Sequence, residues 1–271
     1  MHIQLGLKGS TAPAQYRDRL AYAPATFEFF LDEGDLTPTG LKHLQDAIDE
    51  VKTVTPHIVL HHPMKYGKWA VEMVTPEKEM PELYRFLQFS SDTLLDLAVK
   101  NDIQLLLHGS YSRQTQFFIN HYDSLATAQA VVFNRLDHYA AQGGAHVMLE
   151  NSISPLFYYG DPIMDQTIAA HHYRLAFDTS HCFIKQHGSN DALAASLTTL
   201  RDQVVHYHLV DSYGQTHDSL PLGTGKIDWR TMLPLLNPQA TRIYEVNLAD
   251  QTHANEMLES HRYLTALAST L

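Results

Sequence analysis

The sequence predicts an α/β protein, a (β/α)8 barrel of the TIM-barrel type, in a single domain that spans residues 1–271. Three observations predict it. Runs of β-forming residues alternate with amphipathic helical segments along nearly the whole chain, giving about eight of each. No linker, low-complexity tract or charge block interrupts this alternation. Ionisable side chains follow strand after strand at the carboxyl ends, which a closed barrel gathers at one mouth, whereas an open doubly wound sheet gathers only those near its switch point.

The predicted strands are short runs rich in branched and aromatic residues. They cover 3–7, 26–31, 58–60, 103–107, 146–149, 174–177, 204–210 and 242–244. The predicted helices have apolar residues at a spacing of about 3.6, or begin and end with capping residues. They cover 38–52, 81–100, 125–142, 162–172, 192–203, 231–236 and 253–267. The stretch 64–75 has no clear period, and we expect a long loop there.

Composition excludes several classes of protein. With 44% hydrophobic and 18% charged residues, the chain can bury a large core. No apolar run approaches the roughly 18 residues that span a bilayer, and the first residues lack a secretion signal, so we expect a cytoplasmic protein with no membrane partner. The single cysteine, Cys182, excludes a disulfide framework. A net charge of -11 makes nucleic acid an unexpected partner. The composition does not decide whether the chain forms a homo-oligomer.

The stretch richest in polar side chains that could bind a metal runs from Val204 to Trp229, VVHYHLVDSYGQTHDSLPLGTGKIDW. Alternation along its strand places His206 and His208 on the same face. Further polar side chains follow on the next loop, before a Gly-x-Gly turn: Asp211, His217 and Asp218. This loop is therefore expected to lie at the functional end of the barrel.

Potential metal ligands follow six of the predicted strands. They are His61, His108, Glu150, Asp178 with His181, His208, and Glu245. Imidazole nitrogens and carboxylate oxygens suit a divalent cation with ligand bonds of about 2.0 to 2.3 Å. Glu150 and Glu245 directly follow apolar strands, where an uncompensated charge is costly and a cation would remove the cost. Any one of these residues alone has an ordinary structural alternative, and for Asp178 it is capping of a following helix.

Seven motifs in order, HHP, LLLHG, LEN, FDTSH, HYHLVD, GTG and YE, resemble the xylose isomerase-like TIM-barrel superfamily, which includes sugar isomerases, sugar epimerases and endonuclease IV. The resemblance covers roughly residue 58 to the end of the chain. It implies one central divalent ion held by a set that both branches share: Glu150, Asp178, His208 and Glu245. Mn, Zn, Mg and Co all suit such ligands.

The endonuclease branch implies further ions. His61 and His108 would join Glu150 at a second ion, and His181 would contribute to a third. The third site also needs an Asp and a His before the Gly-x-Gly turn, but these positions hold His217 and Ser219. One ion is expected, with two or three possible. His217 is a candidate ligand of the third, and Asp218 is the alternative that would replace the expected residue there.

The resemblance and the ligand pattern favour an isomerase or epimerase of a small sugar. Glu150 and Glu245 are the expected acid and base that move a proton through an enediolate. We expect His181, His206, Asp211 and Trp69 to contact substrate or to hold the ligands in place. A multi-metal phosphodiesterase acting at abasic sites is the alternative, since it explains His61 and His108. A barrel that only binds a ligand is a third possibility.

Overall fold

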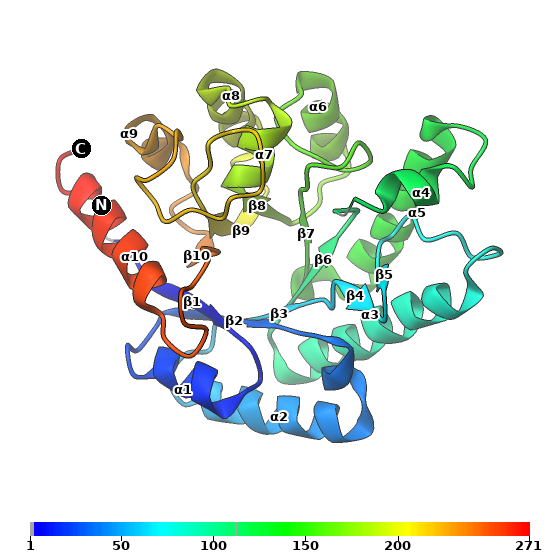
Figure 1. Ribbon diagram of the computed structural model, residues 1–271, viewed down its shortest axis with the longest axis horizontal. Coiled ribbons are helices and arrows are strands. Elements are labelled where there is room, and N and C mark those ends of the chain that lie inside the picture. The colour runs from blue at the N-terminus through cyan, green and yellow to red at the C-terminus, as the bar shows by residue number, and fades with distance from the viewer. Residues whose placement is uncertain (1–2, 112) are drawn as a thin grey trace.

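The computed structural model describes residues 3–111 and 113–271, and its central feature is an eight-stranded parallel sheet curved into a barrel (Figure 1). Neighbouring strands follow the order of the chain. They are β1 (Gly6–Gly9), β2 (Thr26–Phe30), β3 (Ile58–His61), β6 (Gln104–His108), β7 (Val147–Glu150), β8 (Leu175–Asp178), β9 (Val204–Leu209) and β10 (Thr241–Tyr244). This arrangement confirms the predicted barrel.

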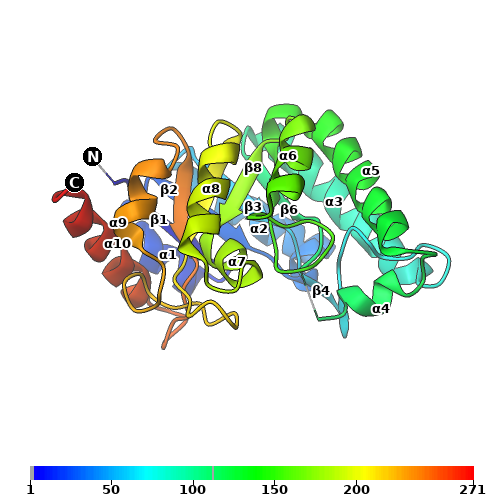
Figure 2. The same cartoon turned by 90° about the horizontal axis from the view of Figure 1, so that it is seen from above.

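Helices cover the outside of the barrel (Figure 1). They are α1 (Pro13–Leu20), α2 (Pro38–Lys52), α3 (Pro81–Asn101), α5 (Leu125–Gly143), α6 (Pro162–Ala170), α8 (Asn190–Leu200), α9 (Trp229–Met232) and α10 (Asn255–Ala268). Shorter elements are the hairpin β4 (Lys65–Tyr66) and β5 (Trp69–Ala70), the helices α4 (Thr115–Ile119) and α7 (Thr179–Lys185), and the 3-10 turns η1 (Glu33–Leu36), η2 (Gly144–His146) and η3 (Leu233–Leu235). Figure 2 shows β4, α4 and α7 on one side of the molecule, beyond the carboxyl ends of the strands.

The first and last strands meet without a ladder between them among the described residues. Their backbones lie in direct contact, because a Cβ added at Gly6 would collide with the carbonyl oxygen of Arg242. Glycine is required here for this close approach, which brings β1 against β10. The two strands therefore add their side chains to the same interior as the other six.

The interior of the barrel changes from apolar to polar along the strands. A small buried cluster near the amino ends consists of Val59, Leu106, Met148 and Ala176. Two residues further along the same strands stand His61, His108, Glu150 and Asp178. Because side chains of a strand alternate, these four point into the interior like the apolar residues before them. The sequence pattern thus directs the ionisable groups to the carboxyl end.

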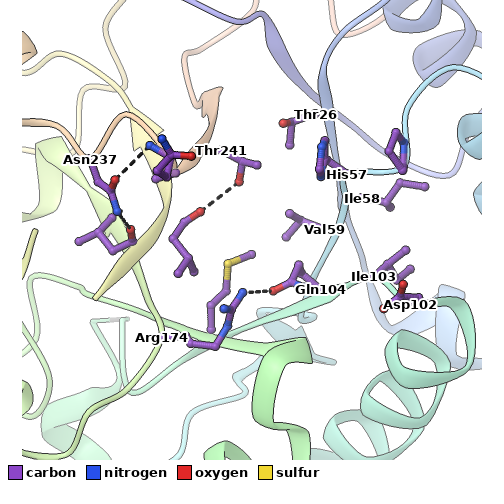
Figure 3. Close-up of a pocket in the computed structure, with 16 residues that line it drawn as sticks. Thr26, His57, Ile58, Val59, Asp102, Ile103, Gln104, Arg174, Asn237 and Thr241 are labelled. Carbon is purple, nitrogen blue, oxygen red and sulfur yellow. Dashed lines mark hydrogen bonds between the residues drawn. The ribbon is translucent and has the colours of Figure 1, made fainter. Parts of the chain in front are cut away.

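A cavity of about 310 Å³ opens at the amino end of the barrel (Figure 3). Thr26, Gln104, Arg174 and Thr241 are among its lining residues. Arg174 donates to the Gln104 side chain at 2.8 Å, an interaction drawn in the figure. This cavity lies across the barrel from the strand ends that carry the predicted ligands.

Several elements differ from the prediction. The first strand was expected at 3–7 but begins at Gly6, because closure against β10 outweighs the low strand propensity of Gly6, Lys8 and Gly9. Helix α1 was not predicted, since only Tyr16 and Arg19 of its residues are buried and no apolar stripe marks it. Helix α4 and the β4–β5 hairpin were also missed, whereas α7 was expected only as the alternative in which Asp178 caps a helix. No helix in the described ranges is long and apolar enough to cross a membrane.

Candidate metal centre

The four ligands of the expected central site converge at the carboxyl end of the barrel. Glu150 ends β7, Asp178 ends β8, His208 lies on β9 and Glu245 follows β10. One ligand atom from each lies within 4.8 Å of the others. Three of the side chains are fully buried, and that of Glu245 is 25% exposed. Four strands therefore bring three carboxylates and one imidazole to a common centre.

Short distances without hydrogen-bond geometry characterise this centre. His208 Nδ1 lies 2.9 Å from Glu150 Oε1 and 2.6 Å from Glu245 Oε2. The geometry nevertheless gives neither His208 Nδ1 nor the two Glu150 oxygens a hydrogen bond, and Asp178 Oδ2 has none either. Buried polar atoms in proteins nearly always have partners. Orphaned lone pairs around one point are what a bound cation requires, so the residues fit a divalent metal.

Asp178 has a structural role as well as a position in this centre. Its Oδ1 accepts the backbone N–H of His181 at 2.6 Å and the Ser180 hydroxyl at 2.9 Å, so it caps α7. The alternative expectation that Asp178 caps a helix is correct, but the cap uses only one of its two carboxylate oxygens, Oδ1. Asn151 fixes the backbone of Asp178 by accepting its N–H at 2.8 Å and donating to its carbonyl at 3.0 Å. The free Oδ2 is thus held in a defined position.

A second group of three potential ligands shares Glu150 with the first. His61 Nε2 and His108 Nε2 lie 3.2 Å apart, and Glu150 Oε2 lies 3.0 Å from His108 Nε2 and 3.7 Å from His61 Nε2. His61 Nδ1 lies 3.0 Å from the carbonyl oxygen of His62 and donates to it, which leaves Nε2 with a lone pair. Burial, together with Lys8, lowers the pKa of His61 to about 3. A neutral imidazole of this kind is ready to bind a metal.

The charges of the centre compensate one another. Burial would raise the pKa of Glu150, but His108 and His208 hold that pKa well below its ordinary value. Burial also disfavours the charged form of His208, yet Glu150, Glu28 and Glu245 raise its pKa well above the usual range. The surrounding carboxylates therefore favour positive charge at this point, and a divalent ion would supply it.

Two buried residues beside the centre, Glu28 and Lys8, are not among the site residues predicted from the sequence. Glu28 on β2 is fully buried and accepts from His206 and His208, so its carboxylate lies directly beneath the predicted ligand. Lys8 on β1 is only 9% exposed and forms ion pairs with Glu28 and Glu245. Burial would lower the pKa of Lys8, but Glu245 and Glu28 outweigh it and raise that pKa. The signal for Glu28 was a lone charge inside the apolar strand TFEFF.

His181 and His217 lie at the edge of the centre. Their ring centroids are 4.8 Å apart, and His181 Nδ1 lies 2.9 Å from the carbonyl oxygen of Asn151 and 3.9 Å from Glu150 Oε1. Neither residue belongs to a group of three ligand atoms among the described residues. Asp218 accepts hydrogen bonds from its own loop, from Thr216 and Tyr213. The structure therefore does not complete a third metal site.

Asp211 and His206 are both held by hydrogen bonds within the barrel. Asp211 accepts from the backbone N–H groups of Gly223 and Ile227 and from the Trp229 indole, so its carboxylate organises the loop after β9. His206 lies one layer below the mouth and bonds to Glu28 and Thr241, which agrees with the expectation that it holds a ligand in place. Contact of either residue with substrate stays a prediction.

Trp69 is also separate from the centre. Its ring stacks on Phe117 at 5.3 Å between centroids, and it lines a surface hollow beside α3 and α4. None of the candidate ligands lines this hollow. The structure therefore does not bring Trp69 together with the candidate ligands, and its contact with substrate stays a prediction.

The fold and the ligand groups together define a barrel of the class that carries buried His and carboxylate clusters able to hold metal at its carboxyl end. The chain belongs to the xylose isomerase-like TIM barrel family, whose sequence pattern it matches over residues 25–266. This match confirms the resemblance inferred from the motifs. No curated protein sequence matches the chain.

Solved structures with the same fold carry names from both functional branches. A D-tagatose 3-epimerase-like protein superimposes with a TM-score of 0.69 at 17% identity, covering 99% of this chain and 98% of that one. A Thermus thermophilus protein soaked with zinc chloride gives a TM-score of 0.68 at 17% identity, with 99% of each chain covered. A family 2 AP endonuclease from Brucella melitensis gives 0.59 at 13% identity, covering 92% of this chain and 95% of that one. At these identities the likeness shows the fold alone.

Proposed function

We propose that this protein is a divalent-metal-dependent isomerase or epimerase of a small sugar or a related hydroxyketone. The observation that carries the proposal is the pair Glu150 and Glu245, whose carboxylates come from well-separated strands and approach the same imidazole nitrogen of His208 at 2.9 and 2.6 Å. Two carboxylates that flank one small centre can remove a proton on one side of a substrate carbon and return it on another.

The chemistry divides between an ion and the side chains. A divalent ion held by Glu150, Asp178, His208 and Glu245 would polarise neighbouring substrate oxygens and acidify the C–H bond between them. Glu245 is the more exposed of the two glutamates, and its ion pair with Lys8 keeps it ionised and able to accept a proton. Glu150 is itself one of the four ligands and faces the same point from the end of β7. His181, 10% exposed at the edge, is placed to hydrogen-bond a substrate oxygen.

The proposal predicts that both glutamates are needed for proton transfer. Glu150→Gln and Glu245→Gln keep the side-chain shape but remove the base, and each should lower the rate by at least about 100-fold. The measurement is exchange of substrate hydrogen with solvent in heavy water, followed by NMR across a panel of ketoses. Asp165→Asn is the matched control, because Asp165 is a buried carboxylate on α6 outside the mouth, and it should exchange normally. Normal exchange in either glutamate variant overturns the assignment.

A second candidate function is a metal-dependent phosphodiesterase of the abasic-site type, favoured by one observation. His61 and His108 complete a second ligand group with Glu150, and two ions sharing a carboxylate are typical of enzymes that activate water against a phosphodiester. The net charge of -11 opposes binding of a nucleic acid backbone.

Two measurements distinguish the candidates. Elemental analysis of the purified protein gives the number of ions per chain and whether they are Mn, Zn, Mg or Co. Incubation with an oligonucleotide that contains an abasic site, at low salt, tests for strand cleavage. Metal-dependent cleavage without ketose exchange replaces the first proposal by the second, and exchange without cleavage excludes the second.

A further inference from the structure

A chain of hydrogen bonds runs through the barrel interior from its amino end to His208. The Thr241 hydroxyl lies 2.6 Å from His206 Nδ1, and His206 Nε2 lies 3.1 Å from Glu28 Oε2. The same carboxylate oxygen lies 2.9 Å from His208 Nε2. Glu28 and both histidines are fully buried. Thr241 lines the amino-end cavity (Figure 3), so the chain joins that cavity to the candidate metal centre.

The positions of the protons follow from the donors and acceptors. An ionised carboxylate only accepts, so His206 and His208 must both donate their Nε2–H to Glu28. The other nitrogen of His206, Nδ1, lies 2.6 Å from the Thr241 hydroxyl, which also lies 3.3 Å from the carbonyl oxygen of Val205. Glu28 therefore accepts one N–H from each histidine.

This arrangement decides which nitrogen of His208 faces the metal centre. With Nε2–H donated to Glu28, Nδ1 is the atom that lies 2.9 Å from Glu150 and 2.6 Å from Glu245. The other oxygen of Glu28 pairs with Lys8 at 3.1 Å, which balances the charge and restrains the carboxylate. A carboxylate behind a ligating histidine fixes its tautomer and raises its basicity.

We propose that Glu28 is the positioning residue of the metal centre, holding His208 in the tautomer whose Nδ1 lone pair binds the cation, with His206 and Thr241 fixing Glu28 from below. This inference rests on the metal-dependent function proposed above. It adds a residue that lies outside the sequence motifs quoted for the ligands, and it relates the buried polar residues beneath His208 to metal binding.

The test is the metal affinity of Glu28→Gln. Chelator competition with Zn²⁺ and with Mn²⁺ gives the dissociation constant, and circular dichroism verifies folding. We expect binding about 10- to 100-fold weaker than in the wild type, with full occupancy restored by excess metal. Asp165→Asn, a buried carboxylate outside the barrel, should bind metal normally. Thr241→Val removes only the far end of the chain and should weaken binding by less than Glu28→Gln.

An affinity of Glu28→Gln within about threefold of wild type overturns the inference. If this variant does not fold, the wild type still decides, because ¹⁵N NMR of the histidine rings in the zinc-loaded protein reports the tautomer. A proton on Nε2 of His208 supports the proposal, and a proton on Nδ1 overturns it. Loss of metal affinity in Glu28→Gln with normal exchange in the Glu150 and Glu245 variants overturns only the proposed function. Normal metal affinity with glutamate-dependent exchange overturns only this inference.

Discussion

The two ligand groups at the mouth share Glu150 but differ in charge and support. The first group, with Asp178, His208 and Glu245, contains three carboxylates, and Glu28 and Lys8 hold its members from behind. The second group adds only His61 and His108 to the shared carboxylate, and His108 Nδ1 is buried without a hydrogen-bond partner.

This difference predicts which of the two ligand groups should bind a metal ion more tightly. Carboxylates favour hard cations and imidazoles favour softer ones such as Zn²⁺. Support behind ligands typically contributes about 10- to 100-fold in metal affinity. We therefore expect the first group to bind its ion more tightly and with less selectivity, and the second group to bind zinc weakly or only after the first is filled.

The largest expected effect comes from removing the shared ligand. Glu150→Gln should lower metal affinity at both groups by more than about 100-fold, because a direct ligand matters more than its supporting partner. Titration with Zn²⁺ monitored by isothermal calorimetry would show the loss of both binding events. A variant that still binds one ion with wild-type affinity would mean that Glu150 belongs to only one group, and the comparison would fail.

A smaller effect is expected at the second group. His108→Asn should remove the weaker binding event and leave the stronger one within about threefold of wild type, because the first group keeps all its ligands. The same calorimetric titration measures both, and His253→Asn, on the exposed surface, is the matched control. Ketose exchange should survive in this variant if the enzyme is an isomerase. Loss of the tighter event would show that the two groups bind as one unit.

These ligands could be predicted because each stands at a fixed place in the pattern. His61, His108, Glu150 and Asp178 end apolar strands, and in a barrel all such ends meet, so alternation of strands and helices was sufficient to expect their convergence. The barrel itself followed from the same alternation.

Glu28 could not be placed in the same way. It lies in the middle of β2 and contacts His206, 178 positions away in the chain, so its role depends on which strands face each other across the interior. Lys8 could equally be a surface lysine or a residue of the site when judged from the sequence, and its burial follows from closure of β1 against β10. Local propensity carries no information on either contact.

The smallest expected effect concerns a buried carboxylate outside both groups, and it tests why the site glutamates stay ionised. Asp165 on α6 accepts the Gly160 N–H at 3.0 Å, but no cationic side chain contributes to its surroundings within the described residues. Burial therefore raises the pKa of Asp165 to about 6, whereas His108 and His208 lower that of Glu150, which is buried even more completely. The contrast separates the effect of burial from that of neighbouring charge.

The sign of the pH dependence follows from linkage. Because the folded-state pKa of Asp165 lies above its unfolded value, its contribution to stability is complete below about pH 4 and is lost as the pH rises through about 6. Asp165→Asn cannot ionise, so its free energy of unfolding relative to wild type should rise by about 1 to 3 kcal/mol between about pH 4 and about pH 7, the upper value being reduced by solvent screening. Urea denaturation at both pH values measures this difference. Asp46→Asn, on the exposed face of α2, should show no such rise, and a relative stability of Asp165→Asn that does not change with pH would mean that Asp165 is held ionised by contacts other than those described.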